Sequence, residues 1–117
     1  MAKSVSKYIY LKGDIVPFED AKIHVLSVGF AYASTVFEGL RAYWNADAQD
    51  LCVFRMSDHA RRLLRSMKLL RMDHAFTEAS LNAAVLELLR ANELREDAHI
   101  RELAFIEGIG PIDTTGP

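Results

Sequence analysis

Residues 29–43 read Gly-Phe-Ala-Tyr-Ala-Ser-Thr-Val-Phe-Glu-Gly-Leu-Arg-Ala-Tyr, and the organisation of the chain is best worked out from this stretch. It mixes aromatic rings, a glutamate and an arginine with glycines, whereas a plain core strand is continuously apolar or alternates. Glycines let a backbone turn or approach a ligand, and rings between small residues form apolar walls with polar tips. Two interpretations stay open: the lining of a binding site, or a buried segment with ordinary tyrosines and one salt bridge.

The C-terminal part of this stretch predicts a strand. Val36–Trp44 is rich in β-branched and aromatic residues, and a polar turn then separates it from a second strand at Leu51–Arg55. Side chains two residues apart on a strand point the same way, so Phe37, Gly39 and Arg41 are expected to share one face.

An earlier hairpin is predicted near the N-terminus. Tyr8–Leu11 and Ile15–Phe18 flank Lys12-Gly13-Asp14, which has the composition of a tight turn. Further along, a period of 3.6 residues predicts two helices. The first is capped by Ser57, and the second begins near Thr77 and stops at Asn92. Their apolar stripes are Ala60, Leu63, Leu64, Met67 and Leu70, and then Leu81, Ala84, Val85 and Leu88.

The chain is predicted to close with a strand at His99–Ile106 and a loop-like tail over residues 108–117. The order of strands, two helices and a last strand indicates an α+β fold, with two helices packed on an antiparallel sheet.

Composition limits the class of protein. The 117 residues are 50% hydrophobic and 26% charged, which predicts one soluble folded domain over residues 1–117. A net charge of -2 disfavours a nucleic-acid partner, and no run of about 20 apolar residues predicts a membrane helix. Cys52 is the only cysteine, which favours a cytoplasmic location. Since it lies in an apolar run, we expect it to be a small buried hydrophobe.

Few residues suggest chemistry by themselves. The four histidines, His24, His59, His74 and His99, lack the spacing of metal ligands, so no metal site is predicted. Arg62 lies beside the first helical stripe, where it either lays its methylenes along the surface or reaches into a cleft to bind an anion. Arg101 lies in the apolar final strand and needs a carboxylate partner. That partner is Glu38, Glu102 or the acid group of a ligand.

Taken together, the short motifs resemble the N-terminal domain of class IV, or fold type IV, pyridoxal-phosphate aminotransferases, and most closely the branched-chain amino acid aminotransferases. The resemblance runs nearly end to end. It is carried by the segments Tyr8–Gly13, Glu19–Val25, Tyr32 with Val36–Arg41, His59–Leu63, Asn92–Leu94 and Ile100–Arg101.

The resemblance implies roles for several residues. Arg62 matches the arginine that holds the phosphate of the cofactor, pyridoxal 5′-phosphate. Arg101 matches the arginine that recognises the side-chain carboxylate of glutamate, and His99 stands where a tyrosine binds the substrate α-carboxylate. The substrate pocket wall is matched by Tyr32, Phe37, Gly39 and Arg41, with Tyr32 expected to reach the site of a neighbouring subunit.

By the same resemblance, the parent enzyme transfers an amino group between branched-chain amino acids and 2-oxoglutarate, so its partners are amino acid and 2-oxo acid substrates. It is expected to be a homodimer or a higher homo-oligomer. No catalytic residue is expected in this chain, because the Schiff-base lysine of the family comes from a second, C-terminal domain that these residues do not include. The fragment alone is therefore expected to be inactive.

Some positions depart from the family pattern. Ala33 replaces a glycine, Glu102 replaces a proline, and the usual specificity loop is not recognisable in residues 108–114. A D-amino acid or amine aminotransferase, or a lyase of the same superfamily, therefore stays open as an alternative. An alternative of another class is a non-catalytic α+β module for dimerisation or binding.

Overall fold

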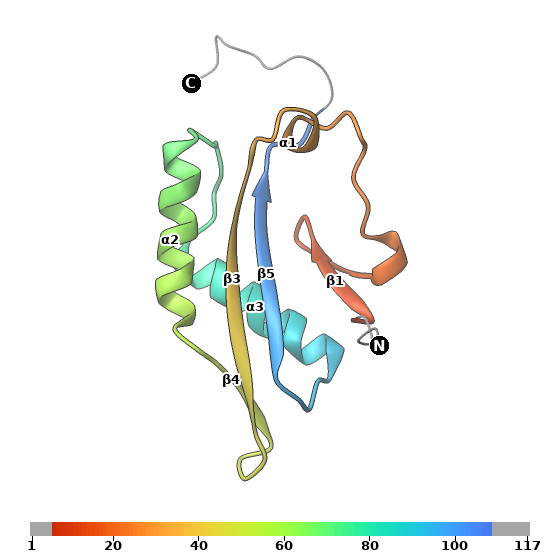
Figure 1. Cartoon of the computed structure of the whole chain (residues 1–117), viewed down its shortest axis with the longest axis vertical. Helices are drawn as coiled ribbons and strands as arrows, with labels where there is room; N and C mark the ends of the chain where they lie inside the picture. Colours follow the sequence, from red (N-terminus) through yellow and green to blue (C-terminus); the bar gives the residue numbers. More distant parts are fainter. Residues whose placement is uncertain (1–5, 109–117) are drawn as a thin grey trace.

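The computed structural model of the chain describes residues 6–108. Figure 1 shows its elements in chain order. They are β1 (Tyr8–Leu11), β2 (Asp14–Pro17), a 3-10 helix (Phe18–Asp20), α1 (Val28–Ala31), β3 (Thr35–Asn45), β4 (Asp50–Val53), α2 (Met56–Leu69), α3 (Glu78–Asn92) and β5 (Ala98–Phe105).

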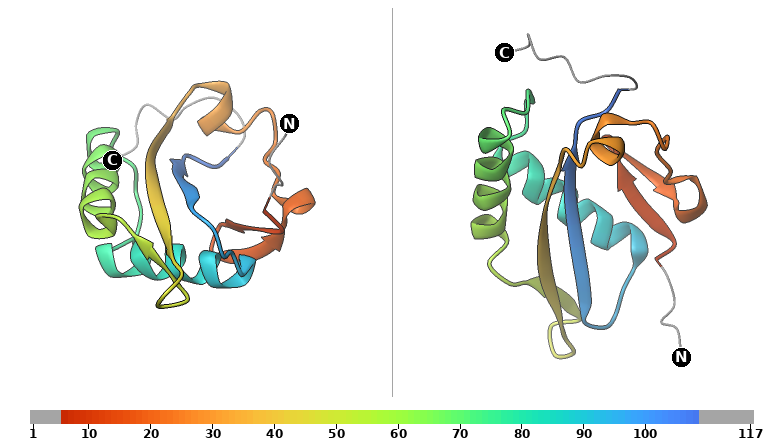
Figure 2. Two further views of the ribbon diagram at one scale, coloured as in Figure 1. Left: turned by 60° about the horizontal axis from the view of Figure 1, so that its bottom comes forward. Right: turned by 45° about the horizontal axis from the view of Figure 1, so that its top comes forward.

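The strands form two antiparallel sheets, so the α+β prediction is confirmed, although the predicted single sheet is divided. β1 and β2 form the expected hairpin, and Lys12 and Gly13 between them both have positive φ, as a two-residue hairpin turn requires. β4, β3 and β5 form the second sheet in that order. In all views of Figures 1 and 2 the β3–β5 ladder runs between α2 and the hairpin.

Strand β3 is paired unevenly along its length. Its residues Thr35 to Ala42 pair with β5, from Phe105 back to Ala98, whereas β4 pairs only with the last four residues, Ala42–Asn45. Within the described part of the chain, residues 35–41 therefore have a strand on one side only. Figure 1 shows α2 standing beside this edge of β3.

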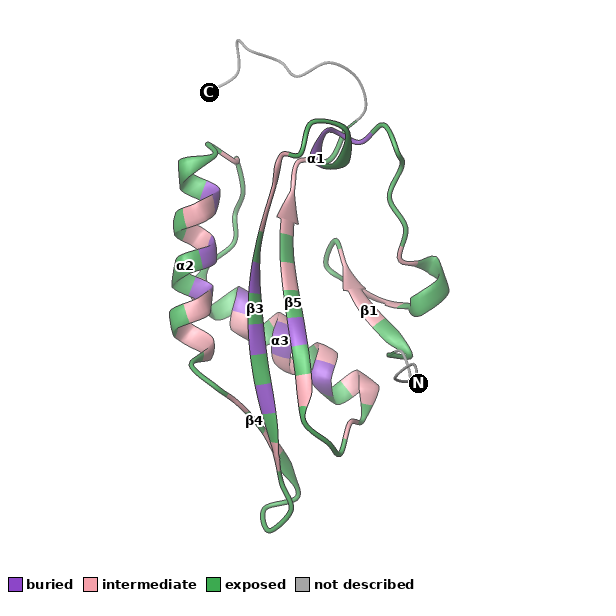
Figure 3. Cartoon of the chain, in the orientation of Figure 1, coloured by how far each residue is buried: buried purple, intermediate pink, exposed green. Residues whose placement is uncertain are grey.

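The hydrophobic core lies between the β3–β5 ladder and the two long helices. Leu40 and Ala42 of β3 and Ile100 of β5 pack against Val85 and Leu89 of α3. In Figure 3 the buried positions alternate along β3 with exposed ones, and the buried stripes of α2 and α3 are visible as well. Those stripes are Ala60, Leu63 and Met67, and then Leu81, Val85 and Leu89, with Leu89 in place of the predicted Leu88.

The starts of the two helices differ from each other. Thr77 caps α3 as predicted, and its hydroxyl accepts a hydrogen bond from the backbone N–H of Ser80. The prediction that Ser57 caps α2 is wrong, because Arg55, in the left-handed conformation, holds that position. The Ser57 hydroxyl accepts instead from the side-chain amide of Asn82 in α3. It serves helix packing, not the helix end.

Two further predictions need correction. Cys52 is exposed, because strand alternation places it opposite Tyr43 on the face that the helices do not cover. The short helix α1 was not foreseen, and Gly29 within it approaches β5 and not a ligand: a Cβ there would lie 2.7 Å from Cβ of Phe105. The predicted strand at His99–Ile106 nearly coincides with β5. The tail and the loop predicted beyond residue 108 lie outside the described residues.

Among residues 6–108, no helix combines the length and the apolar character needed to cross a membrane.

Candidate functional site

Five of the six predicted substrate-binding residues lie on the face of the β3–β5 ladder opposite α2 and α3. We call it the open face, and it comprises Phe37, Gly39, Arg41, His99, Arg101 and Leu103. The register pairs Gly39 with Arg101, Arg41 with His99, and Phe37 with Leu103. The prediction that Phe37, Gly39 and Arg41 share a face is confirmed. Residues far apart in the sequence thus come together at one surface.

A glycine gives His99 its place on this surface. A Cβ on Gly39 would lie 3.1 Å from Nε2 and 3.5 Å from Cε1 of His99. The imidazole therefore extends over position 39, across the ladder from its own backbone. A larger residue at position 39 would displace the ring, so this glycine shapes the centre of the open face.

The open face combines apolar groups with cations. Phe37 is 65% exposed and Leu103 is 55% exposed, and both arginines are exposed beside them. Arg101 forms no ion pair with any of residues 6–108. The expectation that it is buried is wrong, because the alternation of β5 turns it away from the helices. Glu38 and Glu102, its two predicted protein partners, lie on the covered face, which leaves the guanidinium to an anionic ligand.

Tyr32 lies at one end of this ladder. It is the C-cap residue of α1, its side chain is half exposed, and its backbone N–H donates to the carbonyl of Val28. Ala33 follows with φ 56°, a left-handed conformation for which glycine is the favoured residue. The segment is held to the ladder by Thr35, whose hydroxyl donates to the carbonyl of Gly29.

The covered face carries the second half of the candidate site, a network around Glu38. The Arg62 side chain on α2 donates from Nε to Oε2 and from Nη2 to Oε1 of Glu38, both at 2.8 Å. The same Oε1 lies 2.8 Å from Nδ1 of His59. The Glu38 side chain is only 4% exposed, whereas that of Arg62 is 62% exposed. A buried carboxylate thus anchors a guanidinium that reaches solvent.

Charge explains why Glu38 is ionised in this setting. The hydrogen bonds from Arg62 lower the pKa of the Glu38 carboxyl below its ordinary 4.5, and the bond from His59 lowers it further. Burial acts in the opposite direction but does not prevail. Sequence reasoning considered Glu38 only as a partner of Arg101. Strand alternation was the signal that it missed, since it places Glu38 and Arg101 on opposite faces.

Glu102 is a third acidic element that sequence reasoning did not place in the site. It is the register partner of Glu38 on β5, and one of its carboxylate oxygens, Oε1, is buried without a hydrogen-bond partner among residues 6–108. Burial and the neighbouring charge of Glu38 raise the pKa of Glu102 to about 6, although His59 opposes the change.

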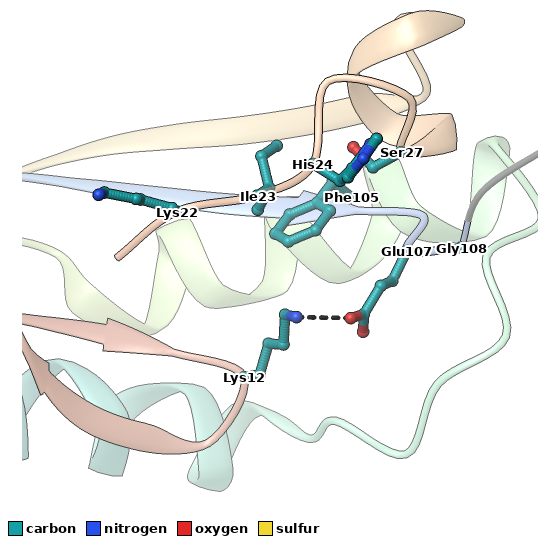
Figure 4. A pocket seen from close by; sticks show the side chains of 8 residues that line it. All are labelled: Lys12, Lys22, Ile23, His24, Ser27, Phe105, Glu107 and Gly108. Carbon is teal, nitrogen blue, oxygen red and sulfur yellow. Dashed lines mark hydrogen bonds and ion pairs between the residues drawn. The ribbon is translucent and has the colours of Figure 1, made fainter. Parts of the chain in front are cut away.

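A separate cavity of about 410 Å³ lies between the β1–β2 turn and the end of β5 (Figure 4). Lys12 bonds Glu107 across it at 2.5 Å, and Phe105 forms part of its wall. None of the predicted site residues lines this cavity. Within the described residues there is also no cluster of three or more metal-ligating side chains.

Comparisons with known proteins agree with this geometry, although no family model matches the chain. The branched-chain-amino-acid aminotransferase of Escherichia coli K12 is 36% identical over 110 residues, which cover 94% of this chain and 35% of that protein. The crystal structure of the enzyme from Thermoproteus uzoniensis with norvaline is 43% identical with a TM-score of 0.87, covering 96% of this chain and 37% of that one.

Two more solved structures of branched-chain amino acid aminotransferases are similar. The enzyme of Thermobaculum terrenum in its PLP form is 41% identical with a TM-score of 0.78, covering 86% of this chain and 33% of that one. A T.th. enzyme, complexed with N-(5′-phosphopyridoxyl)-L-glutamate, is 36% identical with a TM-score of 0.80, covering 90% and 35% respectively.

The fold and the two-faced site therefore define the small α+β domain of fold type IV pyridoxal-phosphate enzymes. Within that class, the chain is homologous to the branched-chain-amino-acid aminotransferases, and it spans about a third of the length of these relatives.

Proposed function

We propose that this chain is the phosphate-binding and substrate-binding domain of a pyridoxal-phosphate aminotransferase that acts on branched-chain amino acids and 2-oxoglutarate. Relatives solved with norvaline and with a phosphopyridoxyl-glutamate adduct support both substrate classes. The observation that carries the proposal is the exposed guanidinium of Arg62, held on one edge by the buried carboxylate of Glu38.

The residues fit the phosphate of the cofactor. Glu38 occupies Nε and Nη2 of Arg62 on one edge, so the two N–H groups of Nη1 and the second N–H of Nη2 stay available. A planar fork with several donors is suited to phosphate oxygens. When bound, pyridoxal 5′-phosphate supplies the electron sink for amino-group transfer.

The open face fits the two kinds of substrate. Phe37 and Leu103 offer apolar surface to a branched side chain, and Arg41 and Arg101 offer positive charge to carboxylates. His99 can donate a hydrogen bond to the α-carboxylate in place of the tyrosine of related enzymes. A surface that has apolar groups and cations together can accept leucine-like substrates as well as glutamate.

The remaining chemistry is proposed to come from outside these residues. Lys68 is the only lysine after residue 22, and it is exposed in the last turn of α2 without a neighbour that would activate it. We therefore assign residues 1–117 to an N-terminal small domain and the Schiff-base lysine to a C-terminal domain. Tyr32 is proposed to reach a neighbouring subunit in a cytoplasmic homodimer or higher homo-oligomer.

The test is an Arg62→Ala variant of the full-length protein, with Arg65→Ala as the matched control, because Arg65 is exposed on the same helix and forms no ion pair among residues 6–108. Loss of charge-assisted hydrogen bonds is expected to weaken binding of pyridoxal 5′-phosphate to the apoprotein about 10- to 100-fold. Arg65→Ala should bind like wild type. Equal dissociation constants for the two variants would contradict the assignment of the phosphate site.

Activity assays address the substrates. Full-length protein should transfer the amino group of leucine to 2-oxoglutarate faster than that of D-alanine or a primary amine, and residues 1–117 alone should show no transfer. A preference for D-alanine or the amine would favour the alternative aminotransferases. Self-association without cofactor binding would favour the non-catalytic module.

A further inference from the structure

We propose that Glu38 is a positioning residue for the phosphate site, which fixes the guanidinium of Arg62 in the orientation that presents its outer edge to a phosphate group. This inference rests on the proposed function, because it takes Arg62 as the phosphate ligand. Glu38 itself touches no ligand, and it acts only through the arginine.

The bond geometry carries the argument. Two parallel hydrogen bonds of 2.8 Å join Nε and Nη2 of Arg62 to the two oxygens of Glu38. A planar guanidinium held by two bonds on one edge has its remaining donors directed away from that edge. Because the Arg62 side chain is largely exposed, it would otherwise sample many rotamers. Binding a phosphate would then have to order the side chain as well.

The anchor is more rigid than the group that it holds. Glu38 lies in β3 between Phe37 and Gly39, with its side chain almost completely buried. His59 on α2 contacts the same oxygen that accepts from Nη2 of Arg62. Residues 59 and 62 are three apart on the helix and so lie on one side of it. Strand and helix together therefore fix the carboxylate.

The charges around Glu38 favour this role. The groups that face it are Arg62 and His59 from α2 and Glu102 from β5. Arg62 and His59 stabilise the ionised form of Glu38, whereas burial favours the protonated form of Glu102. Of the two neighbouring carboxyl groups, Glu38 is thus the one that keeps its negative charge for Arg62.

The test compares Glu38→Gln with Glu78→Gln in the full-length apoprotein. Glu78 is a matched control, because it pairs with Arg61 on α2 at 2.6 Å but not with Arg62. Each variant is titrated with pyridoxal 5′-phosphate and with pyridoxal, which lacks the phosphate. Glu38→Gln is expected to weaken the phosphorylated ligand about 10-fold and pyridoxal less than about 2-fold. Glu78→Gln should change neither.

A double variant separates positioning from a general structural role. In an Arg62→Ala background, Glu38→Gln should cause no further loss of affinity, since its only route to the phosphate has been removed. Equal losses for pyridoxal and its phosphate, or a full additional loss in the double variant, would overturn the inference. If Arg62→Ala alone leaves the affinity unchanged, the proposed function fails first.

His59→Ala provides an independent route if Glu38→Gln does not fold. The His59 side chain is 22% exposed, so its removal disturbs the core less than a change at Glu38. Because Glu38 keeps both bonds to Arg62, the expected loss is smaller, about 3-fold for the phosphorylated ligand, with pyridoxal unaffected. Unchanged affinity for both ligands would count against the positioning network.

Discussion

Replacing Glu102 with glutamine should make the protein more stable at neutral pH and leave its stability unchanged in mild acid. Burial and the charge of Glu38 raise the pKa of Glu102 to about 6, from an ordinary value of 4.5. A carboxyl group with a raised pKa binds its proton more tightly in the folded state. Its ionisation therefore costs stability progressively as the pH rises from 4.5 to about 6, and the cost is constant above that range.

The size of the effect follows from the two pKa values. Their difference of about 1.5 corresponds to about 2 kcal/mol, at 1.36 kcal/mol for each pKa unit. Glu102 is only partly buried, so solvent screening reduces this to on the order of 1 kcal/mol. Glutamine has nearly the same shape and cannot ionise. Glu102→Gln should consequently gain that amount above pH 7.

The assay is urea unfolding of wild type and Glu102→Gln between pH 4.5 and 8, followed by circular dichroism. Glu87→Gln serves as the control, because Glu87 is exposed on α3 and forms no ion pair among residues 6–108. Its unfolding free energy should differ from wild type by the same small amount at every pH. In parallel, the carboxyl carbon of Glu102 should titrate in NMR spectra with a midpoint near 6.

Two results would refute this reasoning. If the difference in unfolding free energy between Glu102→Gln and wild type does not change with pH, Glu102 does not titrate differently in the folded and unfolded states. If the variant becomes less stable than wild type as the pH rises, the ionised carboxylate has a favourable partner, in conflict with the buried, unbonded Oε1.

Two further predictions concern the backbone around the candidate site, and both are checked by urea unfolding at pH 7. Gly29→Ala should destabilise the protein by about 1–3 kcal/mol, because the new Cβ would lie 2.7 Å from Cβ of Phe105 and 3.1 Å from the carbonyl oxygen of Ile106. A cost below about 0.5 kcal/mol would mean that α1 can move away from β5. Ala33→Gly should stabilise the protein by up to about 1 kcal/mol, since it relieves a positive φ at a non-glycine residue. A clear loss of stability would contradict that strain.

The strands and the α3 helix were predictable from the sequence because several local signals agree there. The Lys12-Gly13 turn needs two positive φ values, and Thr77 with Ser80 forms a reciprocal cap. At the start of α2 the local signals compete. Asp58 in the first turn bonds Nε of Arg55 at 2.7 Å, and Asn82 from a distant helix takes up the Ser57 hydroxyl. Such tertiary contacts are not written in the sequence around residue 57.

The arginines show a second limit of sequence reasoning. The apolar neighbours of Arg101 suggested burial and a carboxylate partner, but side chains of a strand alternate between two faces, and residue 101 lies on the face without helices. Position 38, counted along β3, faces the helices. The partner of Glu38 was therefore to be sought on α2, where Arg62 lies at the edge of the apolar stripe.

Strand β3 links the two halves of the candidate site. Glu38 on its covered face holds Arg62, while Phe37 and Gly39, its immediate neighbours, belong to the open face. A register shift of one residue between β3 and β5 would exchange the two faces and so remove the phosphate anchor and the substrate surface together. Residues 35–41 also have no strand beside them on the side of α2, within the described part of the chain. A ligand with an anionic end therefore has an open strand edge between the guanidinium of Arg62 and the open face.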